Sequence, residues 1–410
     1  MTDRTLDPLV ACHARVAEGC PLATLHDALA SVLGLHETAR DVRRWNNPKV
    51  DNFRRWQRIL AERGWGAPHW PVRWGGTDWS PLRKHIFFEE LYRIDAPDFG
   101  WQGTHMLAPV LFAFGTEAQC ERYAPSMLRG EEFWCQGFSE PGAGSDLANL
   151  KTAARLDGDE WVINGQKIWT SDALHAGWGF FLVRTDPTAK PQRGVSFLMV
   201  KMDTPGITVR PIVSIDGRQE LTEVFLDNVR VPRDQLIGEA GMGWTYAKYL
   251  LDKERTSSAF LYFNRRRFEQ AKDLARTLRH DGRPLIEDPG FSRKLARVDA
   301  DLNALYWSVL RILAEEQNKY PTNAVVSALK IRGSELQQRV TGLQVDALGP
   351  LSLRHFELDS PETDDADLMR HWQEFTVGPM SQFLFQRAST IYGGAREVQK
   401  NIIAKLAFGF

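Results

Sequence analysis

The order of hydrophobic periodicities along the chain sets its fold class. From Leu6 to about Gly130, apolar residues recur three and four positions apart, as on one face of a helix. From Glu131 to about Gly238, short strand-like segments are separated by Pro and Gly turns. After Gly238 the helical spacing returns and continues. The sequence therefore predicts an α+β protein with a helical, a β and a second helical part.

The β part has the pattern of short antiparallel strands. Residues 160–169 are typical of two strands joined by a type I′ turn at Asn164-Gly165. Further strands follow at short intervals, which favours a small antiparallel barrel or sandwich. We expect these strands at 178–184, 195–201, 207–212 and 223–231.

The second helical part has long periodic segments with few breaks, which is the pattern of a four-helix bundle. We expect one helix to run without interruption from Trp244 to Arg279. In the first helical part, residues 64–80 are dense in Gly, Pro and Trp and predict a packed, non-helical loop. The other expected helices span 21–45, 118–129, 292–320, 323–348, 378–391 and 397–408. The domain organisation predicted from these patterns is a helical extension (1–44), a helical domain (45–130), a middle β-barrel domain (131–238) and a helix-bundle domain (239–410).

Composition and charge exclude several kinds of protein. Lys and Arg number 51 against 52 Asp and Glu, and this near-neutral balance argues against a general binder of nucleic acid or anionic membranes. The four cysteines form no CxxC pair, which argues against a disulfide framework or a structural zinc site. The first residues are polar and acidic, unlike a signal peptide, and no stretch has the apolar length of a membrane span. We expect a soluble cytoplasmic protein without a metal.

A Gly/Ser-rich segment, SEPGAGSD at residues 139–146, follows the first expected strand. It lacks the third glycine of a dinucleotide-binding fingerprint, and no strand–helix–strand unit surrounds it, so that interpretation fails. Such a loop can present N–H groups and hydroxyls to an anionic or carbonyl-rich ligand. The alternative, and from this segment alone the more frequent one, is a turn that simply needs glycine torsions.

Three more segments carry a related signal. These are NGQKIWTS at 164–171, the pattern LxxVRVPxxxLIGExGxGW at 226–244, and IYGGAREVQKNIIAK at 391–405. With SEPGAGSD they resemble, in order, the acyl-CoA dehydrogenase family over roughly residues 45–410. The Trp-rich loop and the N-terminal extension are similar to those of bacterial members that act on pimeloyl-type or steroid side-chain acyl-CoAs.

The resemblance implies FAD held between the β domain, the helix bundle and a neighbouring subunit. In the middle domain it assigns to FAD the residues Gln136, Phe138, Ser139, Ser145, Trp169 and Ser171, with Trp169 packed on the isoalloxazine and Ser171 near its N5. In the C-terminal part it assigns Gln344, Gly349, Gly394 and Glu397, where residues 344–349 resemble a turn that receives a partner subunit's FAD. Ala347 and Leu348 replace the usual Gly-Gly of that turn, and Ala395 replaces a frequent FAD-binding Thr.

The resemblance also implies a catalytic carboxylate that removes the α-proton of the acyl-CoA. Many members carry a Glu directly after the Tyr of the terminal motif, but here that position is Gly393. A second position used in the family lies on the long bundle helix, and Glu254 falls on it. Glu254 comes four residues after Leu250 and seven after Ala247, so it continues an apolar helix face that would desolvate a base. The alternative is a surface ion-pair lattice that includes Arg255.

For the substrate, the resemblance implies Ser145 and Arg255 near the CoA moiety and Gly393 beside the reacting carbons. It places Trp101, Gln102 and Thr104 along the acyl cavity, where Gly100 and Gly103 predict a roomy space. It further implies electron transfer to an electron-transfer flavoprotein, and a homodimer, homotetramer or heterotetramer. Two other functions remain open, namely a flavin monooxygenase or nitroalkane-oxidase-like enzyme on the same fold, and a non-catalytic subunit of a heteromeric dehydrogenase.

Overall fold

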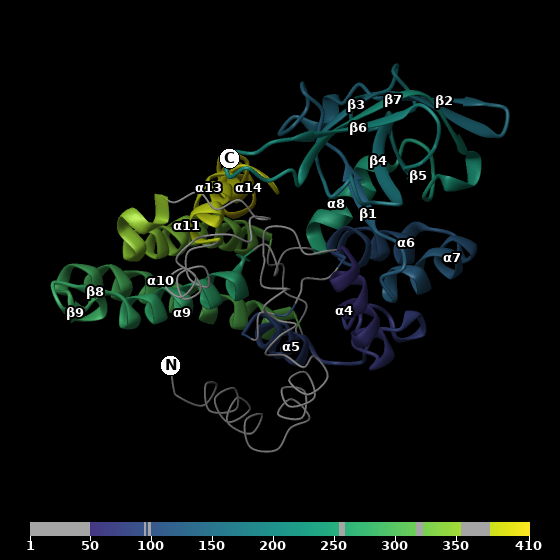
Figure 1. The fold of residues 1–410 in the computed structure, drawn as a ribbon. Helices are drawn as coiled ribbons and strands as arrows, with labels where there is room; N and C mark the ends of the chain where they lie inside the picture. The colour runs from purple at the N-terminus through teal and green to yellow at the C-terminus, as the bar shows by residue number, and fades with distance from the viewer. Residues whose placement is uncertain (1–49, 94–95, 97–99, 254–258, 317–322, 354–377) are drawn as a thin grey trace.

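Three parts of different secondary structure follow one another along the chain, as the periodicities predict (Figure 1). The computed structural model describes residues 50–93, 96, 100–253, 259–316, 323–353 and 378–410. The first two described parts are a set of short helices and a curled middle sheet, and a group of longer helices follows (Figure 1). The expected extension 1–44 and helix 21–45 lie outside the described residues. None of the helices within the described ranges is long and apolar enough to cross a membrane.

The first helical part surrounds the Trp-rich loop. Its helices are α4 (Val50–Glu62), α5 (Pro81–Arg93), the π-helix η2 (Gln102–Leu107), α6 (Ala108–Phe114) and α7 (Glu117–Leu128). The loop between α4 and α5 holds only one short 3₁₀ turn, η1 (Val72–Trp74), so the prediction of a packed non-helical loop is confirmed. Its Trp70 is 2% exposed, and Trp74 stacks on Phe112 with ring centroids 5.8 Å apart.

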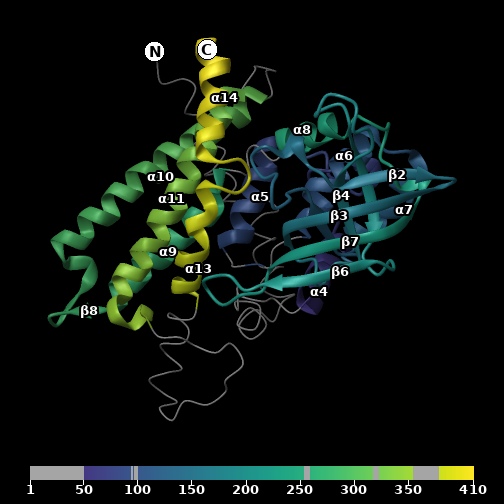
Figure 2. The ribbon, with the colours of Figure 1, turned by 90° about the horizontal axis from the view of Figure 1, so that it is seen from above.

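The middle part is a single curled sheet of seven strands, several of which lie side by side in Figure 2. The strands are β1 (Trp134–Gly137), β2 (Ala153–Asp157), β3 (Glu160–Ser171), β4 (Trp178–Arg184), β5 (Val195–Lys201), β6 (Ile207–Ile212) and β7 (Leu221–Pro232). Their order is β1-β4-β2-β3-β7-β6, and β5 pairs with β4. Most pairs are antiparallel as predicted, but β1 and β2 both pair with β4 in parallel.

The predicted hairpin turn at Asn164-Gly165 is wrong, because β3 runs through both residues. The hairpin between β2 and β3 instead turns at Gly158, which has a left-handed φ of 63°. The pairing of β3 with β7 shifts register between Ile163 and Gly165, and an added Cβ at Gly165 would stand 2.6 Å from the Cα of Thr152. The Asn164 side chain exchanges hydrogen bonds with Asn228 on β7, at 2.9 and 3.3 Å. The pair Asn-Gly therefore serves a close approach between strands rather than a turn.

The C-terminal part contains α8 (Gly243–Lys253), α9 (Leu261–Thr277), α10 (Pro289–Glu316), α11 (Asn323–Leu348), α13 (Pro379–Phe385), the 3₁₀ helix η8 (Gln386–Thr390) and α14 (Arg396–Phe408). One apolar core is shared by α9, α10 and α11, while α13 and α14 pack on α11. The predicted single helix 244–279 is wrong, because α9 begins only after Phe260, whose φ of 50° is left-handed. The predicted helix 378–391 tightens to 3₁₀ geometry after Phe385.

The sheet and the helices share their cores. The largest apolar cluster joins side chains of η2, α6 and α7 to β1, β4, β5 and α8. This shared packing fixes the ends of the strands against the helices that come before and after them in the chain. The predicted flavin residues of the middle part lie near the ends of β1 and β3.

Candidate functional site

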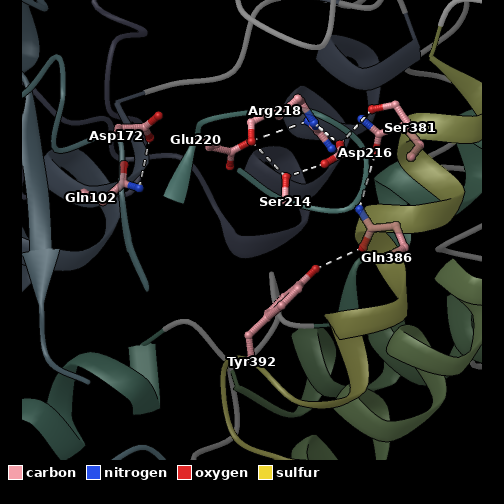
Figure 3. A network of polar contacts seen from close by, with 10 residues as sticks. Gln102, Asp172, Ser214, Asp216, Arg218, Glu220, Ser381, Gln386 and Tyr392 are labelled. Atoms are coloured by element: carbon pink, nitrogen blue, oxygen red, sulfur yellow. Dashed lines mark hydrogen bonds and ion pairs between the residues drawn. The ribbon is translucent and has the colours of Figure 1, made fainter. Parts of the chain in front are cut away.

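Segments far apart in the sequence meet at the end of β3 (Figure 3). Asp172 follows the last residue of that strand, and its backbone N–H donates to the carbonyl of Glu220 over 3.0 Å. The side-chain amide of Gln102, from η2, donates to the Asp172 carboxylate over 3.3 Å (Figure 3). Gln102 was predicted to line an acyl cavity, and Ser171 to face a flavin. The structure brings these two predicted regions into direct contact.

The loop between β6 and β7 connects the sheet to the C-terminal helices. The Arg218 side chain is only 5% exposed and forms ion pairs with Asp216 and, over 3.5 Å, with Glu220. Its guanidinium lies 4.5 Å from the ring centre of Phe385, and the Ser381 hydroxyl donates to Asp216 over 2.9 Å (Figure 3). Burial and the nearby Asp172 charge raise the pKa of Glu220. A carboxylate of elevated pKa therefore lies between the end of β3 and helix α13.

The terminal motif forms a turn beside this network. The Tyr392 hydroxyl donates to the side-chain carbonyl of Gln386 over 3.0 Å (Figure 3). Lys330 on α11 donates to the backbone carbonyls of Ser389 and Tyr392, at 2.8 and 2.9 Å, and burial lowers its pKa to about 8. Gly393 has a left-handed φ of 64°, which a Glu at this position would adopt only under strain.

The predicted flavin-facing strands lie together. The backbone N–H of Ile168 donates to the Ser139 carbonyl over 3.0 Å, which joins the two motifs directly. Trp169 is 56% exposed and has a left-handed φ of 61°, an unfavourable conformation for a large side chain. Phe138 instead turns its ring into the core, with the rings of Phe180 and Phe197 each 5.8 Å away. Gln136, Ser139 and Ser171 are each half-buried.

The Gly/Ser loop is open. An added Cβ at Gly142 or Gly144 would meet no atom within 4 Å, and neither residue has a left-handed φ. Ser145 is exposed beside them. Neither a left-handed φ nor packing within the described chain therefore requires glycine at these two positions.

The residues that the resemblance assigns to FAD in the C-terminal part lie on or beside α11 and α14. The predicted turn at 344–349 is wrong, because α11 stays helical to Leu348 and only Gly349 is left-handed, with φ 52°. Gln344 is 1% exposed, and its amide donates to the Arg267 carbonyl over 3.2 Å. Glu397 is exposed in the first turn of α14, and Gly394 precedes that helix with a φ of 92°.

Of the two glycines predicted to enlarge the acyl cavity, Gly103 has a packing role. An added Cβ at Gly103 would lie 3.0 Å from the Trp134 ring, so glycine there lets η2 approach β1. Thr104 is 1% exposed, and its hydroxyl donates to the Gly100 carbonyl over 2.9 Å. The ring of Trp101 stacks on that of His105 with centroids 4.1 Å apart. Trp101 and Thr104 thus make contacts within or beside the π-helix, whereas Gln102 forms a hydrogen bond to Asp172 at the end of β3.

The stack continues to His69, which predicts acid sensitivity. His69 stacks on His105 at 4.1 Å, and burial lowers its pKa to about 4 despite its hydrogen bond to the Thr104 carbonyl. Because the folded pKa lies below the unfolded value, the stabilisation is complete above pH 6.5 and is lost as the pH falls toward 4. Between pH 7 and pH 5, we expect the free energy of unfolding of the wild type to fall by about 2 kcal/mol more than that of His69→Phe. Urea unfolding midpoints at both pH values measure this, and equal losses would contradict it.

The predicted base and its neighbour, Glu254 and Arg255, lie outside the described residues. The face that leads to them is as predicted, because Ala247 and Leu250 on α8 are 1% and 0% exposed. The sequence did not indicate Asp172, Arg218 or Glu220. Arg218 sits in the segment DGRQE, which looks like an exposed turn, and only its contacts with α13 identify it as buried.

Comparisons with known proteins match all three parts of the chain. Residues 33–131, 135–229 and 241–408 match the models "Acyl-CoA dehydrogenase, N-terminal domain", "middle domain" and "C-terminal domain". The chain is 37% identical over 359 residues to acyl-CoA dehydrogenase IpdE1 of Mycobacterium tuberculosis, covering 87% of each chain. It is similar to the Tcur3481-Tcur3483 steroid ACAD structure (TM-score 0.81, 30% identity, 96% and 98% covered). It is also similar to the ChsE4-ChsE5 complex from Mycobacterium tuberculosis (TM-score 0.79, 29% identity, 95% and 97% covered).

Proposed function

The chain belongs to the acyl-CoA dehydrogenase family, and from that premise we propose that it oxidises a bulky acyl-CoA to the trans-2-enoyl-CoA with FAD as cofactor. It is an oxidoreductase of the acyl-CoA dehydrogenase type. The observation that carries the finer proposal is the contact between Gln102 and Asp172, because it joins the predicted acyl cavity to the predicted flavin wall.

The residues present fit FAD. Trp169 exposes a large aromatic surface from a strained backbone, and a planar isoalloxazine would cover it. The open Gly142 and Gly144 leave room for a pyrophosphate to approach the backbone, with the Ser145 hydroxyl beside it. We assign Gln136, Ser139 and Ser171 to the flavin edge and the backbone of Phe138 to its side.

In this proposal Glu254 removes the α-proton, and Arg255 lies near the CoA moiety. Backbone N–H groups polarise the thioester carbonyl, which acidifies that proton. Gly393, where many relatives have a Glu, leaves space for the substrate rather than a base. When bound, FAD supplies the acceptor, through its N5, for the hydride that leaves the β-carbon.

For the substrate class and the assembly, we draw on the relatives. One similar structure is described as a steroid ACAD, and another is a complex of two differently named chains. We therefore propose that the substrate is a steroid-derived acyl-CoA and that the protein is an oligomer of like or unlike subunits. From the sequence and the family resemblance, we further propose a cytoplasmic location and an electron-transfer flavoprotein as the electron acceptor.

Anaerobic titration with a panel of acyl-CoAs tests the proposal. We expect the protein to be yellow and its flavin absorbance to bleach with steroid side-chain acyl-CoAs more completely than with short straight-chain ones. A yellow protein that no acyl-CoA bleaches but that consumes oxygen with another substrate would favour the monooxygenase or nitroalkane-oxidase alternative. A colourless protein that gains flavin only on mixing with a partner chain would favour the non-catalytic subunit.

A further inference from the structure

Two buried charged residues of the recognised motifs have no part in the chemistry described so far. Glu140 belongs to SEPGAGSD, and Lys167 belongs to NGQKIWTS. Lys167 is 0% exposed and Glu140 is 8% exposed, and the Lys167 ammonium lies 2.7 Å from a Glu140 carboxylate oxygen. An ion pair inside the protein thus joins the two motifs to each other.

The hydrogen bonds of this pair are complete. The Lys167 ammonium donates to Glu140 Oε1 (2.7 Å) and to the backbone carbonyls of Phe138 (3.2 Å) and Leu182 (2.7 Å), which uses all three of its protons. The Glu140 carboxylate also accepts the backbone N–H groups of Lys151 (2.6 Å) and Thr152 (2.9 Å). Four segments therefore converge on one pair of side chains, namely the end of β1, β3, β4 and the start of β2.

The pair lies directly behind the predicted flavin wall. Its partners Phe138 and Glu140 flank Ser139, and Lys167 comes two residues before the exposed, strained Trp169. Between them, the N–H of Ile168 donates to the Ser139 carbonyl. The ion pair and this backbone hydrogen bond together connect the segments that carry Ser139 and Trp169.

Stability alone does not account for such a pair. A buried ion pair often contributes no more than well-packed apolar residues of the same volume, because both charges lose their hydration. Burial lowers the pKa of Lys167 to about 8, and although burial by itself would raise the pKa of Glu140, the Lys167 charge and hydrogen bonds hold it below its usual range. Both groups are therefore charged near neutral pH, with fixed partners.

We propose that Glu140 and Lys167 are a positioning pair that holds the Ser139 and Trp169 segments at the separation required by FAD. The inference rests on the proposed function, since it assumes that FAD is the bound group. Because neither side chain faces the exposed side of the wall, the pair acts on FAD only through the backbone segments that it ties together.

Titration of the FAD-free protein with FAD tests the pair without any turnover. We expect Lys167→Met and Glu140→Gln each to raise the FAD dissociation constant at least about tenfold and to shift the flavin absorbance bands. The double variant should bind FAD no more weakly than the weaker single variant, because either change already breaks the unit. The control is Lys201→Met, which removes an exposed pair with Asp203 at 2.9 Å and should leave FAD affinity within about twofold.

The outcomes separate this inference from the proposed function. If wild type binds no FAD with or without a partner chain, both fail. If wild type binds FAD and Glu140→Gln binds it with the same affinity and spectrum, only the positioning role fails, even where the variant melts at a lower temperature. Glu140→Gln keeps the shape of the side chain, so it decides the result if Lys167→Met does not fold.

Discussion

Glu254→Gln is expected to lower turnover of an acyl-CoA by about three to four orders of magnitude while FAD stays bound. Glutamine keeps the size and polarity of the side chain but cannot accept the α-proton. The variant is mixed anaerobically with the acyl-CoA that best bleaches the wild-type flavin, and the rate at which the flavin absorbance falls is recorded. The bound flavin, quantified after release, should match wild type.

Asp252→Asn is the control for this variant. Asp252 is a carboxylate two residues earlier in the sequence, and the family resemblance assigns it no role. We expect it to keep turnover within about threefold of wild type, because no proton transfer depends on it. Normal bleaching by Glu254→Gln would remove Glu254 as the base. Loss of bleaching in Asp252→Asn alone would move the assignment to Asp252.

Gly333→Ala is expected to destabilise the protein by about 3 kcal/mol, more than its small size suggests. Gly333 lies on α11, and an added Cβ would stand 2.0 Å from the carbonyl oxygen of Ala259 and 2.6 Å from its carbonyl carbon. Both are backbone atoms of a residue that is 0% exposed, so either the backbone at Ala259 or α11 must move. The Gly333 carbonyl also accepts the Asn264 side-chain amide over 3.0 Å. Urea unfolding midpoints measure the loss.

The same substitution at Gly342 is its matched control. Gly342 lies nine residues further along α11, where an added Cβ would meet only the Phe383 ring, at 3.9 Å. Alanine is the better helix former by about 1 kcal/mol, so Gly342→Ala should stabilise the protein. Opposite signs for the two variants support the close approach at Ala259. Two similar small gains would show that α11 and Ala259 are further apart than the structure has them.

The bounds of secondary-structure elements were predicted best where one hydrophobic periodicity persists over many residues. Helix α11 begins and ends where its apolar spacing does, at Asn323 and Leu348, and the Trp-rich loop forms because Gly and Pro prevent regular structure. The failures have a tertiary cause. Asn164-Gly165 has the composition of a turn, but the approach of Thr152 and the bonds to Asn228 hold it inside a strand. Before α9 the left-handed residue is Phe260 rather than a glycine, and no proline lies beside it, so the sequence does not signal where this helix begins.

For the candidate site, the motifs predicted the segments but not their connections. The exposed Trp169 and the open Gly/Ser loop fit what the motifs imply. The contact of Ser381 with Asp216 joins residues 165 apart in the chain, which no local pattern records. The burial of Lys167 could not be predicted for another reason. A lysine in a strand normally points to solvent, whereas this one has 0% exposure.

The position of Tyr392 in the chain bears on how the protein is made. Figure 3 draws this residue in the same polar network as the end of β3, although it follows α11 and α13 in the chain. During synthesis the middle sheet can emerge and fold long before the turn that completes the site is available. The nascent polypeptide therefore carries the exposed Trp169 surface without this turn beside it until the C-terminal helices have also been synthesised.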